Sequence, residues 1–250
     1  MKTIAAVLCG INRDLQIEEL EIPELKSGQV LVNIAYSGIC QSQLNEIKGL
    51  KGEDKFLPHT LGHEGSGIVE AVGPDVRKVK SEDRVVSTWI KGAGADVPSV
   101  VYKRKDGSRV NSGAISTFIQ KAVISENRIV KIPDALSLKE AALLGCAIPT
   151  GSGIIINSMD AIRGKSIAIF GVGGVGLSAL VAAKIKGASI IMAIDVSGEK
   201  LKQAELLGAT HVYNAKNEDI PAAIIGAMNG KGVDYAIESA GKKETMEMAF

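Results

Sequence analysis

The chain has 250 residues, of which 46% are hydrophobic and 23% charged, and these proportions exclude a disordered or collagen-like protein. Its 29 Lys and Arg residues nearly balance its 28 Asp and Glu residues, so the net charge of +1 provides no electrostatic footprint for nucleic acid. The three cysteines, Cys9, Cys40 and Cys146, lie far apart and are odd in number, which argues against a disulfide framework and favours the reducing cytoplasm.

No segment has the pattern of a membrane anchor. The apolar run 4–9 is short and continues into polar residues without a cleavage signal, so we interpret it as the first strand. The most apolar window, 167–183, is interrupted by four glycines and is shorter than an ordinary membrane-spanning helix. We therefore expect neither a nucleic acid nor a membrane as a partner.

The first part of the chain, up to about residue 135, consists of short β-rich segments at 15–21, 30–36, 66–72 and 115–124. This half is predicted to be a compact all-β unit. The sequence Ser137-Leu-Lys-Glu140 is a capping box that opens an Ala/Leu-rich helix. After the Pro-Thr-Gly-Ser-Gly segment that begins at Pro149, strand and helix patterns alternate. We therefore expect two domains, 1–150 and 151–250.

The second half predicts strands separated by helices. The strands are expected at 166–170, 189–194, 210–213 and 233–238, and the helices at about 174–186, 198–207 and 219–229. This alternation indicates a parallel sheet with helices on both faces, so the fold class is α/β. Another helix begins near residue 243. Because dinucleotide-binding sheets of this kind usually have six strands, the four found here predict a chain that is truncated at its C-terminus.

A glycine-rich turn follows strand 166–170 directly. It contains Gly171, Gly173, Gly174, Val175 and Gly176, and a helical pattern begins immediately afterwards. The G-x-G-x-x-G spacing provides a tight turn, a close backbone approach to a pyrophosphate, and close packing of helix on sheet. In this strand–turn–helix context the motif predicts a dinucleotide-binding site.

An acidic residue, Asp195, ends the next predicted strand, 19 residues after Gly176. A carboxylate at this place can accept hydrogen bonds from a ribose diol and repels a 2′-phosphate, which favours NAD over NADP. Lys200 lies one helical turn further and could reach the same ribose. Two structural alternatives remain, since Asp195 could cap the helix that follows and Lys200 could lie on a solvated helix face.

Potential metal ligands occur in three separate segments: Gly38-Ile-Cys40-Gln-Ser42, Gly62-His63-Glu64, and the residues around Cys146. Each segment alone has a structural alternative, because cysteine is often a small buried hydrophobe and His63 could be a satisfied core histidine. Spacing alone therefore does not establish a metal site.

Together with the glycine-rich turn, these motifs resemble the zinc-dependent medium-chain alcohol dehydrogenase family, over the whole chain. The resemblance implies a GroES-like all-β catalytic domain followed by a Rossmann domain that is incomplete here. It also implies that Cys40, His63 and Cys146 bind one catalytic zinc, with Glu64 as an intermittent fourth ligand. Three protein ligands and one open position suit a catalytic zinc.

The same resemblance assigns further site residues. Ser42 corresponds to the hydroxyl that bonds the substrate alcohol and begins the proton relay, so Ser42 and Glu64 are the expected catalytic residues. Thr150 and Val175 correspond to residues that pack behind the nicotinamide ring, and Trp89 to one that lines the substrate pocket. For Val175 and Trp89, ordinary core packing is the alternative.

Three residues near Cys40 depart from the family pattern. Gln41 stands where a basic side chain often meets the pyrophosphate, and Gln43 replaces the Asp that usually orients the zinc-bound histidine. Asn45 stands where some members have the terminal histidine of the proton relay. The resemblance therefore leaves the orientation of His63 and the exit of the proton open.

A fourth departure concerns segment 91–113, where many relatives have four cysteines that bind a structural zinc. This segment has no cysteine and predicts an exposed charged hairpin about Asp106-Gly107, with binding of an anionic substrate or a subunit contact as the alternative. We therefore expect one catalytic zinc and no structural zinc.

The favoured function is hydride transfer between an alcohol or polyol and NAD by a cytoplasmic zinc-dependent oxidoreductase. One alternative is a zinc-free quinone or enoyl-type reductase of the same superfamily, although such relatives generally lack the cysteine ligands. Another is a non-catalytic dinucleotide-binding protein. The expected partners are a small alcohol or carbonyl substrate and, for the full-length parent, further copies in a dimer or tetramer.

Overall fold

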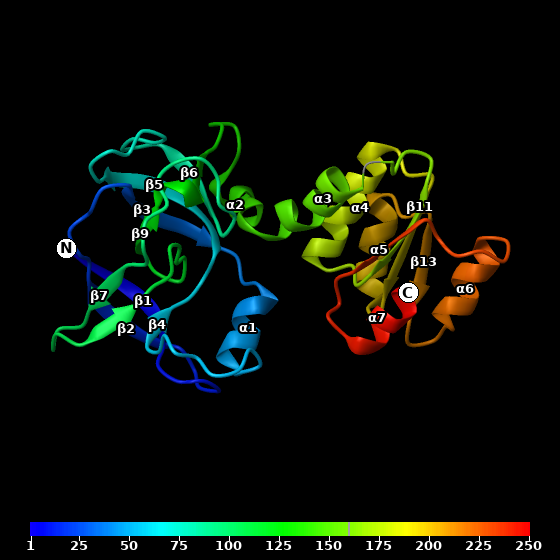
Figure 1. The fold of residues 1–250 in the computed structure, drawn as a ribbon, viewed down its shortest axis with the longest axis horizontal. Helices are drawn as coiled ribbons and strands as arrows, with labels where there is room; N and C mark the ends of the chain where they lie inside the picture. The colour runs from blue at the N-terminus through cyan, green and yellow to red at the C-terminus, as the bar shows by residue number, and fades with distance from the viewer. Residues whose placement is uncertain (160) are drawn as a thin grey trace. The chain divides into compact units, whose positions relative to one another are not determined.

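The computed structural model describes residues 1–159 and 161–250, which divide into two compact units, Met1–Cys146 and Ala147–Phe250. The first unit is built mainly from strands and the second alternates strands with helices, so the predicted fold class is confirmed (Figure 1). The division falls between Cys146 and Ala147, whereas the expected border between residues 150 and 151 lies inside helix α3 (Ala147–Ser158).

The first unit contains a closed barrel, with strand order β1-β2-β7-β8-β4, and a five-stranded sheet, with order β10-β6-β5-β3-β9. The strands and helices of this unit are β1 (Lys2–Leu8), β2 (Gln16–Glu21), β3 (Gln29–Ser37), α1 (Gln41–Ile47), β4 (His59–Thr60), β5 (Glu64–Val72), β6 (Arg84–Thr88), β7 (Val101–Lys103), β8 (Arg109–Asn111), β9 (Lys121–Ser125), η1 (Glu126–Arg128), β10 (Ile129–Lys131), α2 (Leu138–Ala141) and η2 (Ala142–Gly145).

The core of this unit joins barrel and sheet. Leu20 and Tyr102 from the barrel and Val32 and Ile124 from the sheet are fully buried in one hydrophobic cluster. Burying one such aliphatic side chain contributes about 1.5–3 kcal/mol. The Tyr102 hydroxyl accepts a hydrogen bond from the backbone N–H of Val123 at 2.8 Å, and burial raises the pKa of Tyr102 to about 12.

The predicted hairpin about Asp106-Gly107 is confirmed, because it connects the antiparallel strands β7 and β8. Gly107 has a φ of +85°, a conformation that glycine adopts without a steric penalty. The guanidinium of Arg104 pairs with the Glu18 carboxylate of β2 at 2.6 Å. This ion pair attaches the charged turn to the barrel.

The second unit is a parallel four-stranded sheet with the order β13-β12-β11-β14. Besides α3, its elements are β11 (Ser166–Phe170), α4 (Gly174–Lys186), β12 (Ile190–Asp195), α5 (Gly198–Leu207), β13 (His211–Asn214), α6 (Ile220–Ala227), β14 (Tyr235–Glu238) and α7 (Lys243–Ala249). All predicted strands and helices of this half occur, with ends shifted by one or two residues.

Successive side chains of the central strand β11 pack on opposite faces of the sheet. Ile167 and Ile169 join a hydrophobic cluster with residues of α3, α4 and α5, whereas Ala168 and Phe170 join another with residues of α6 and α7. Because β11 is covered on both faces, its sequence is apolar throughout and does not alternate.

Two predictions made from local pattern differ from the structure, and one segment without a predicted structure is helical. Helix α1 follows Cys40 in a half that was expected to be all-β. The segment 115–124 forms a strand only from Lys121, and its first part contributes one isolated bridge, Ala5 to Ile119. The Pro149–Gly153 segment is helical within α3, and its proline is tolerated because it lies in the first turn.

The helix predicted at Ser137 is short and is followed by η2, although the Ser137 side chain does accept the N–H of Glu140. Among the described residues, no single helix is long and apolar enough to cross a membrane. Of the helix pairs in this part of the chain, one bent pair, Leu138–Gly145 with Ala147–Ser158, is long and apolar enough when its two members are taken together. This pair is weak evidence for a membrane span, because core helices of soluble proteins pass the same test.

A buried carboxylate organises the region where relatives were expected to bind a structural zinc. Glu126 is 3% exposed, and its carboxylate accepts backbone N–H bonds from Arg77, Lys78 and Ala95 at 2.7–2.8 Å. Gly94 leaves room for this side chain, since a Cβ at Gly94 would lie 2.9 Å from Cγ of Glu126. Burial opposes ionisation, but the three hydrogen bonds bring the pKa of Glu126 below its ordinary value.

Replacing Glu126 by Gln should lower the free energy of unfolding at pH 7 by about 2 kcal/mol, because an amide leaves one backbone N–H without an acceptor. Since the pKa of Glu126 is lowered on folding, this stabilisation is present above the ordinary value of 4.5 and is lost as the pH falls through the folded-state value. Urea unfolding at pH 7 and pH 4 measures both effects. Glu53→Gln, at an exposed position, is the control, and equal stability of the two variants at pH 7 would contradict the prediction.

Candidate functional site

Four potential metal ligands from three parts of the first unit converge in space. Cys40 precedes helix α1, His63 and Glu64 stand at the start of β5, and Cys146 follows η2. One ligand atom of each residue lies within 4.8 Å of all the others. Glu64 and Cys146 are buried, and Cys40 and His63 are partly exposed. The structure thus brings together all four residues that the sequence analysis assigned to the metal site.

Glycines on two sides of Glu64 make this convergence possible. A Cβ at Gly38 would lie 2.6 Å from Cδ of Glu64, and a Cβ at Gly145 would lie 2.7 Å from its Cα. Gly145 faces backbone atoms that cannot give way, so only glycine fits there, whereas a Cβ at Gly38 would displace the end of the Glu64 side chain. Because Cys40 follows Gly38 by two residues and Cys146 directly follows Gly145, this packing brings both thiols to the start of β5.

Gln43 takes the orienting position that the sequence left open. Its Oε1 accepts the backbone N–H of Cys40 at 3.0 Å, and its Nε2 bonds to Nδ1 of His63. Nε2 of His63 in turn lies 3.2 Å from Sγ of Cys146. Since the amide nitrogen donates, Nδ1 accepts, and the ring proton of neutral His63 is on Nε2, facing the thiol.

The imidazole of His63 is held in its neutral form. Burial is the largest cause of its lowered pKa, and the positive charge of Lys51 adds to the effect. A neutral imidazole is the form that binds metals. Binding through Nε2 moves the ring proton to Nδ1, which then needs an acceptor. The Gln43 amide can supply this acceptor only by turning its oxygen away from Cys40.

The donor set fits a zinc ion. Two thiols and one imidazole are soft and borderline ligands that zinc prefers, and zinc also accepts a carboxylate. Three ligands with Glu64 as an intermittent fourth would leave one tetrahedral position for a substrate. A second group, Glu46, Asp54 and His59, also lies within 4.8 Å, but its donors are mostly oxygen and the ammonium of Lys51 is 2.9 Å from Glu46. Among the described residues, the first cluster is therefore the one that suits zinc.

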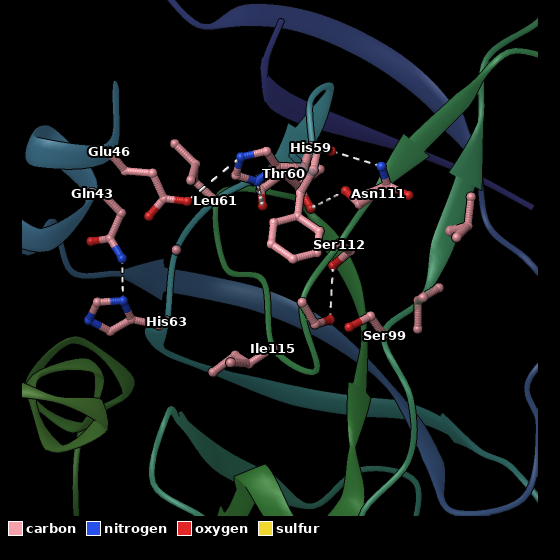
Figure 2. A pocket seen from close by; sticks show the side chains of 15 residues that line it. Gln43, Glu46, His59, Thr60, Leu61, His63, Ser99, Asn111, Ser112 and Ile115 are labelled. Atoms are coloured by element: carbon pink, nitrogen blue, oxygen red, sulfur yellow. Dashed lines mark hydrogen bonds and ion pairs between the residues drawn. The ribbon is translucent and has the colours of Figure 1, made fainter. Parts of the chain in front are cut away.

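A pocket of about 470 Å³ reaches this cluster at His63 alone. Gln43 and His63 line one end, and Ser99, Asn111 and Ser112 line the other (Figure 2). Apolar side chains between the two ends include those of Leu61 and Ile115 (Figure 2). An alcohol whose reacting carbon lies near His63 therefore finds a mainly apolar wall along the pocket.

Two predicted substrate residues lie near the ends of secondary-structure elements of the first unit. Ser42 is in the first turn of α1, and its Oγ accepts a hydrogen bond from Nζ of Lys51 at 2.9 Å. Trp89 follows β6 and is 47% exposed, so the alternative of core packing is wrong for this residue. Trp89 does not line the pocket that begins at His63.

The glycines of the predicted dinucleotide turn have three different environments. Gly171 has a φ of +85°, as the tight turn after β11 requires. A Cβ at Gly173 would meet nothing within 4 Å, which leaves its backbone accessible to a ligand. A Cβ at Gly176 would overlap the carbonyl oxygen of Gly171. The turn therefore has the accessible cradle and the close packing that a pyrophosphate site needs.

Asp195, at the end of β12, is bonded to this turn. Its Oδ2 accepts the backbone N–H of Val172 at 2.9 Å, and its Oδ1 accepts that of Ser197 at 2.9 Å. Nζ of Lys200 lies 4.0 Å from Oδ2. The N-cap of α5 is Ser197, whose side chain accepts the N–H of Lys200, so Asp195 holds the cap residue but is not itself the cap. Each carboxylate oxygen retains acceptor capacity, so a bond to a ribose remains compatible with both contacts.

Thr150 and Val175 lie on α3 and α4, which pack closely. A Cβ at Gly151 would overlap the carbonyl oxygen of Val175 and lie 2.8 Å from Cβ of Ser178. Oγ1 of Thr150 is buried and has no hydrogen-bond partner among the described residues. A polar atom of this kind is suited to a ligand, but the assignment of Thr150 and Val175 to a nicotinamide stays a prediction.

Sequence reasoning missed the polar residues that surround α1. Glu46 and Lys51 bond to each other at 2.9 Å, and His59 bonds to Asp54 at 2.8 Å. Charged residues in a loop are usually solvated, so no local pattern distinguishes them. The one signal that the sequence offers is the pair of glycines, Gly49 and Gly52. In the structure both have positive φ values and turn the loop back toward the helix.

Two family descriptions match the chain. Residues 26–134 match the alcohol dehydrogenase GroES-like domain, and residues 174–250 match the zinc-binding dehydrogenase domain. These two matches include Cys40, His63 and the glycine-rich turn from Gly174 onward, but not Cys146.

Individual relatives are similar over nearly the whole chain. Alcohol dehydrogenase class-2 isozyme 2 of Oryctolagus cuniculus is 33% identical over 277 residues, covering 99% of this chain and 73% of the relative. The structure of an alcohol dehydrogenase zinc-binding domain protein from Burkholderia ambifaria matches with a TM-score of 0.90 and 34% identity, covering 100% of this chain and 73% of that one. Benzyl alcohol dehydrogenase from Acinetobacter calcoaceticus matches with a TM-score of 0.87, 33% identity and the same coverage.

The position of Gln43 predicts how the affinity for zinc can be raised. In Gln43→Glu, one carboxylate oxygen can accept the N–H of Cys40 while the other accepts Nδ1–H of a metal-bound His63. We expect this variant to bind Zn²⁺ about 10- to 100-fold more tightly in a chelator competition assay. Gln41→Glu adds the same charge two residues away, where the native side chain bonds Asn45. If both variants bind Zn²⁺ equally tightly, the amide of Gln43 does not limit the affinity.

Proposed function

Since the chain belongs to the zinc-binding alcohol dehydrogenase family and is an oxidoreductase acting on alcohols, we propose that it transfers a hydride between a small alcohol or polyol and NAD, with one catalytic zinc. The observation that carries this proposal is the convergence of Cys40, His63, Glu64 and Cys146. When bound, zinc supplies a Lewis acid that favours loss of the alcohol proton.

The residues around the metal cluster have separate tasks in this proposal. Gln43 lies beside Nδ1 of His63 and, with its amide oxygen turned to accept the Nδ1 proton, would hold the ring so that Nε2 faces the other ligands. Ser42 presents its hydroxyl in the first turn of α1, where it takes up the proton of the substrate alcohol. Leu61 and Ile115 in the pocket exclude water from the carbon chain of the substrate.

The second unit binds NAD in this proposal. The accessible backbone at Gly173 and the N-terminus of α4 receive the pyrophosphate, because N–H groups at a helix N-terminus attract anions. Asp195 accepts a hydrogen bond from the adenosine ribose, and its charge disfavours a 2′-phosphate. The dinucleotide supplies the hydride acceptor for alcohol oxidation.

Two alternative functions have less support. A zinc-free quinone or enoyl-type reductase has no need for two cysteines and a histidine with all ligand atoms within 4.8 Å. A non-catalytic dinucleotide-binding protein has no need for a pocket that reaches His63 of this cluster. A turnover assay with alcohols and NAD distinguishes the catalytic from the non-catalytic function. We propose a reducing, cytoplasmic location because the metal cluster needs free thiols, and assembly into dimers or tetramers remains part of the proposal.

We expect metal analysis to find one Zn²⁺ per chain. Cys146→Ala should lose most of this zinc, because it removes one of three nitrogen and sulfur ligands, whereas Cys9→Ala should retain it. Cys9 is the matched control since its thiol bonds to Glu18, away from the metal cluster. Two Zn²⁺ per chain would contradict the single site, and full zinc in Cys146→Ala would contradict the ligand assignment.

Asp195→Ala should weaken NAD binding by about 1–3 kcal/mol, the contribution of a hydrogen bond to a charged group, and should weaken NADP binding less. The ratio of kcat/KM for NAD and NADP is the appropriate measurement. The substitution also removes the bond from Asp195 to the turn at Val172. This loss weakens the binding of both cofactors equally, so it does not change the ratio. Glu199→Ala removes a nearby charge at the start of α5 and should leave the ratio unchanged. A wild-type protein that uses NADP as well as NAD would contradict this assignment.

A further inference from the structure

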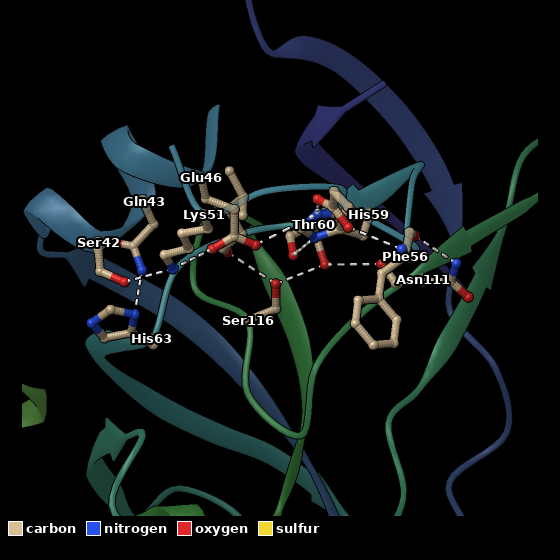
Figure 3. A network of polar contacts seen from close by, with 12 residues as sticks. Ser42, Gln43, Glu46, Lys51, Phe56, His59, Thr60, His63, Asn111 and Ser116 are labelled. Atoms are coloured by element: carbon tan, nitrogen blue, oxygen red, sulfur yellow. Dashed lines mark hydrogen bonds and ion pairs between the residues drawn. The ribbon is translucent and has the colours of Figure 1, made fainter. Parts of the chain in front are cut away.

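Lys51 connects the hydroxyl of Ser42 to the solvent. Its Nζ lies 2.9 Å from Oγ of Ser42 and 2.9 Å from Oε2 of Glu46 (Figure 3). The side chain of Lys51 is 47% exposed, so its ammonium group contacts both the Ser42 hydroxyl and bulk water. An amine at this place can exchange protons with the hydroxyl on one side and with water on the other.

The backbone holds Lys51 in this position. The loop after α1 turns at Gly49 and Gly52, with φ values of +69° and +91°. Glu46, one helical turn after Ser42 on α1, accepts a hydrogen bond from the returning ammonium group. The spacing of four residues places Ser42 and Glu46 on one face of the helix, so one Lys51 side chain can bond to both.

The carboxylate of Glu46 is itself held from the other side. Its Oε1 lies 3.6 Å from Nε2 of His59, and that nitrogen bonds to Oδ2 of Asp54 at 2.8 Å (Figure 3). Nδ1 of His59 lies 3.2 Å from the carbonyl oxygen of Thr60. His59 is buried, so these bonds fix its ring and the carboxylate beside it. Glu46 is therefore a positioning residue for Lys51.

The charges that face Lys51 come from several elements. On its own loop are Glu53, Asp54 and Lys55, which with Glu46 line one surface pocket. Glu46 belongs to α1 and His59 to β4. The positive charge of Lys51 also helps to lower the pKa of His63, which directly precedes β5. Asn45, where relatives were expected to end their relay, bonds Gln41 and has an amide that does not exchange a proton at working pH.

We propose that Lys51 is the proton-exchanging group behind Ser42, with Glu46 as its positioning residue. In alcohol oxidation Lys51 first releases one ammonium proton to water, and Ser42 gives its own proton to the amine so formed while Oγ of Ser42 takes up the O–H proton of the substrate. NAD, when bound, would accept the carbinol hydrogen as hydride, so that the substrate ends as the carbonyl compound. In carbonyl reduction the ammonium group returns the proton through Ser42.

This inference rests on the proposed function, and the experiment separates the two. In the zinc-loaded protein, Lys51→Ala should lower kcat for alcohol oxidation about 10²-fold or more, the usual contribution of general acid–base catalysis. The zinc content and the affinity for NAD should stay unchanged. Lys55→Ala is the matched control because Lys55 is an exposed lysine of the same loop, and it should retain the wild-type kcat.

Two further measurements test proton exchange itself. Added primary amines should restore part of kcat in Lys51→Ala, with a rate that depends on the basicity of the amine. Lys51→Arg keeps the positive charge but cannot release a proton at working pH, so its kcat should stay low. A wild-type kcat in Lys51→Arg would show that charge alone suffices and would overturn the proposal.

The role of Glu46 in positioning Lys51 can be tested without measuring enzyme activity. Glu46→Gln removes the carboxylate that holds Nζ of Lys51 beside Ser42, so the amine is freer to react with a reagent in solution. Acetic anhydride should then acetylate Lys51 faster than in the wild type, relative to Lys55 as the internal reference. An unchanged ratio would contradict the role of Glu46.

The outcomes distinguish this inference from the proposed function. A wild-type protein that oxidises no alcohol with NAD would overturn the proposed function and this role with it. An active wild type whose kcat and pH profile are unchanged in Lys51→Ala would overturn the role of Lys51 alone. A fall in kcat that no amine reverses would assign Lys51 a purely structural role and also overturn it.

Discussion

Close packing of the backbone around Glu64 brings the candidate metal ligands together. A Cβ at Gly145 would lie 2.7 Å from Cα of Glu64, and a Cβ at Gly38 would lie 2.6 Å from Cδ of its side chain. Each glycine is followed within two residues by a thiol, Cys40 or Cys146. The backbone at Gly145 can approach the start of β5 only because it has no side chain, and at Gly38 the absence of a Cβ leaves the Glu64 side chain in its place.

Helix α1 organises the polar groups around these ligands, although it has only seven residues. Gln43 bonds the backbone of Cys40 and the ring of His63, and so connects two of the ligands. Ser42 and Glu46, on another face of the helix, both bond Lys51. One short helix therefore sets the orientation of the histidine and the surroundings of the hydroxyl at the same time. Both effects come from one helix because its successive side chains point in different directions from a single rigid backbone.

The segment 91–113 lacks the cysteines that the family resemblance led us to expect, and a carboxylate holds part of it. The carboxylate of Glu126 accepts three backbone N–H groups, two from Arg77 and Lys78 and one from Ala95. Hydrogen bonds to a buried ionised acceptor are stronger than those to a neutral one, so a single side chain holds two loops against the barrel and sheet. Because the Glu126 carboxylate must be ionised, this attachment of the loops depends on pH. Unlike a zinc site, it needs neither a metal nor reduced cysteines.

The sequence by itself determined the strand–helix alternation of the second half and the glycine-rich turn at Gly171. Both depend on neighbours along the chain, namely apolar runs of strand length and glycines at fixed spacing directly after β11. The residues of the candidate metal cluster were also found from sequence, but only through the resemblance of motifs, since spacing alone left Cys40 and His63 with structural alternatives. Tertiary structure decided the rest. Helix α3 contains Pro149 and two glycines that disfavour a helix, and it forms because Gly151 allows close packing on α4. The contact of Lys51 with Ser42 depends on a loop that returns to its own helix. No local sequence pattern predicts which residue an exposed charged side chain contacts.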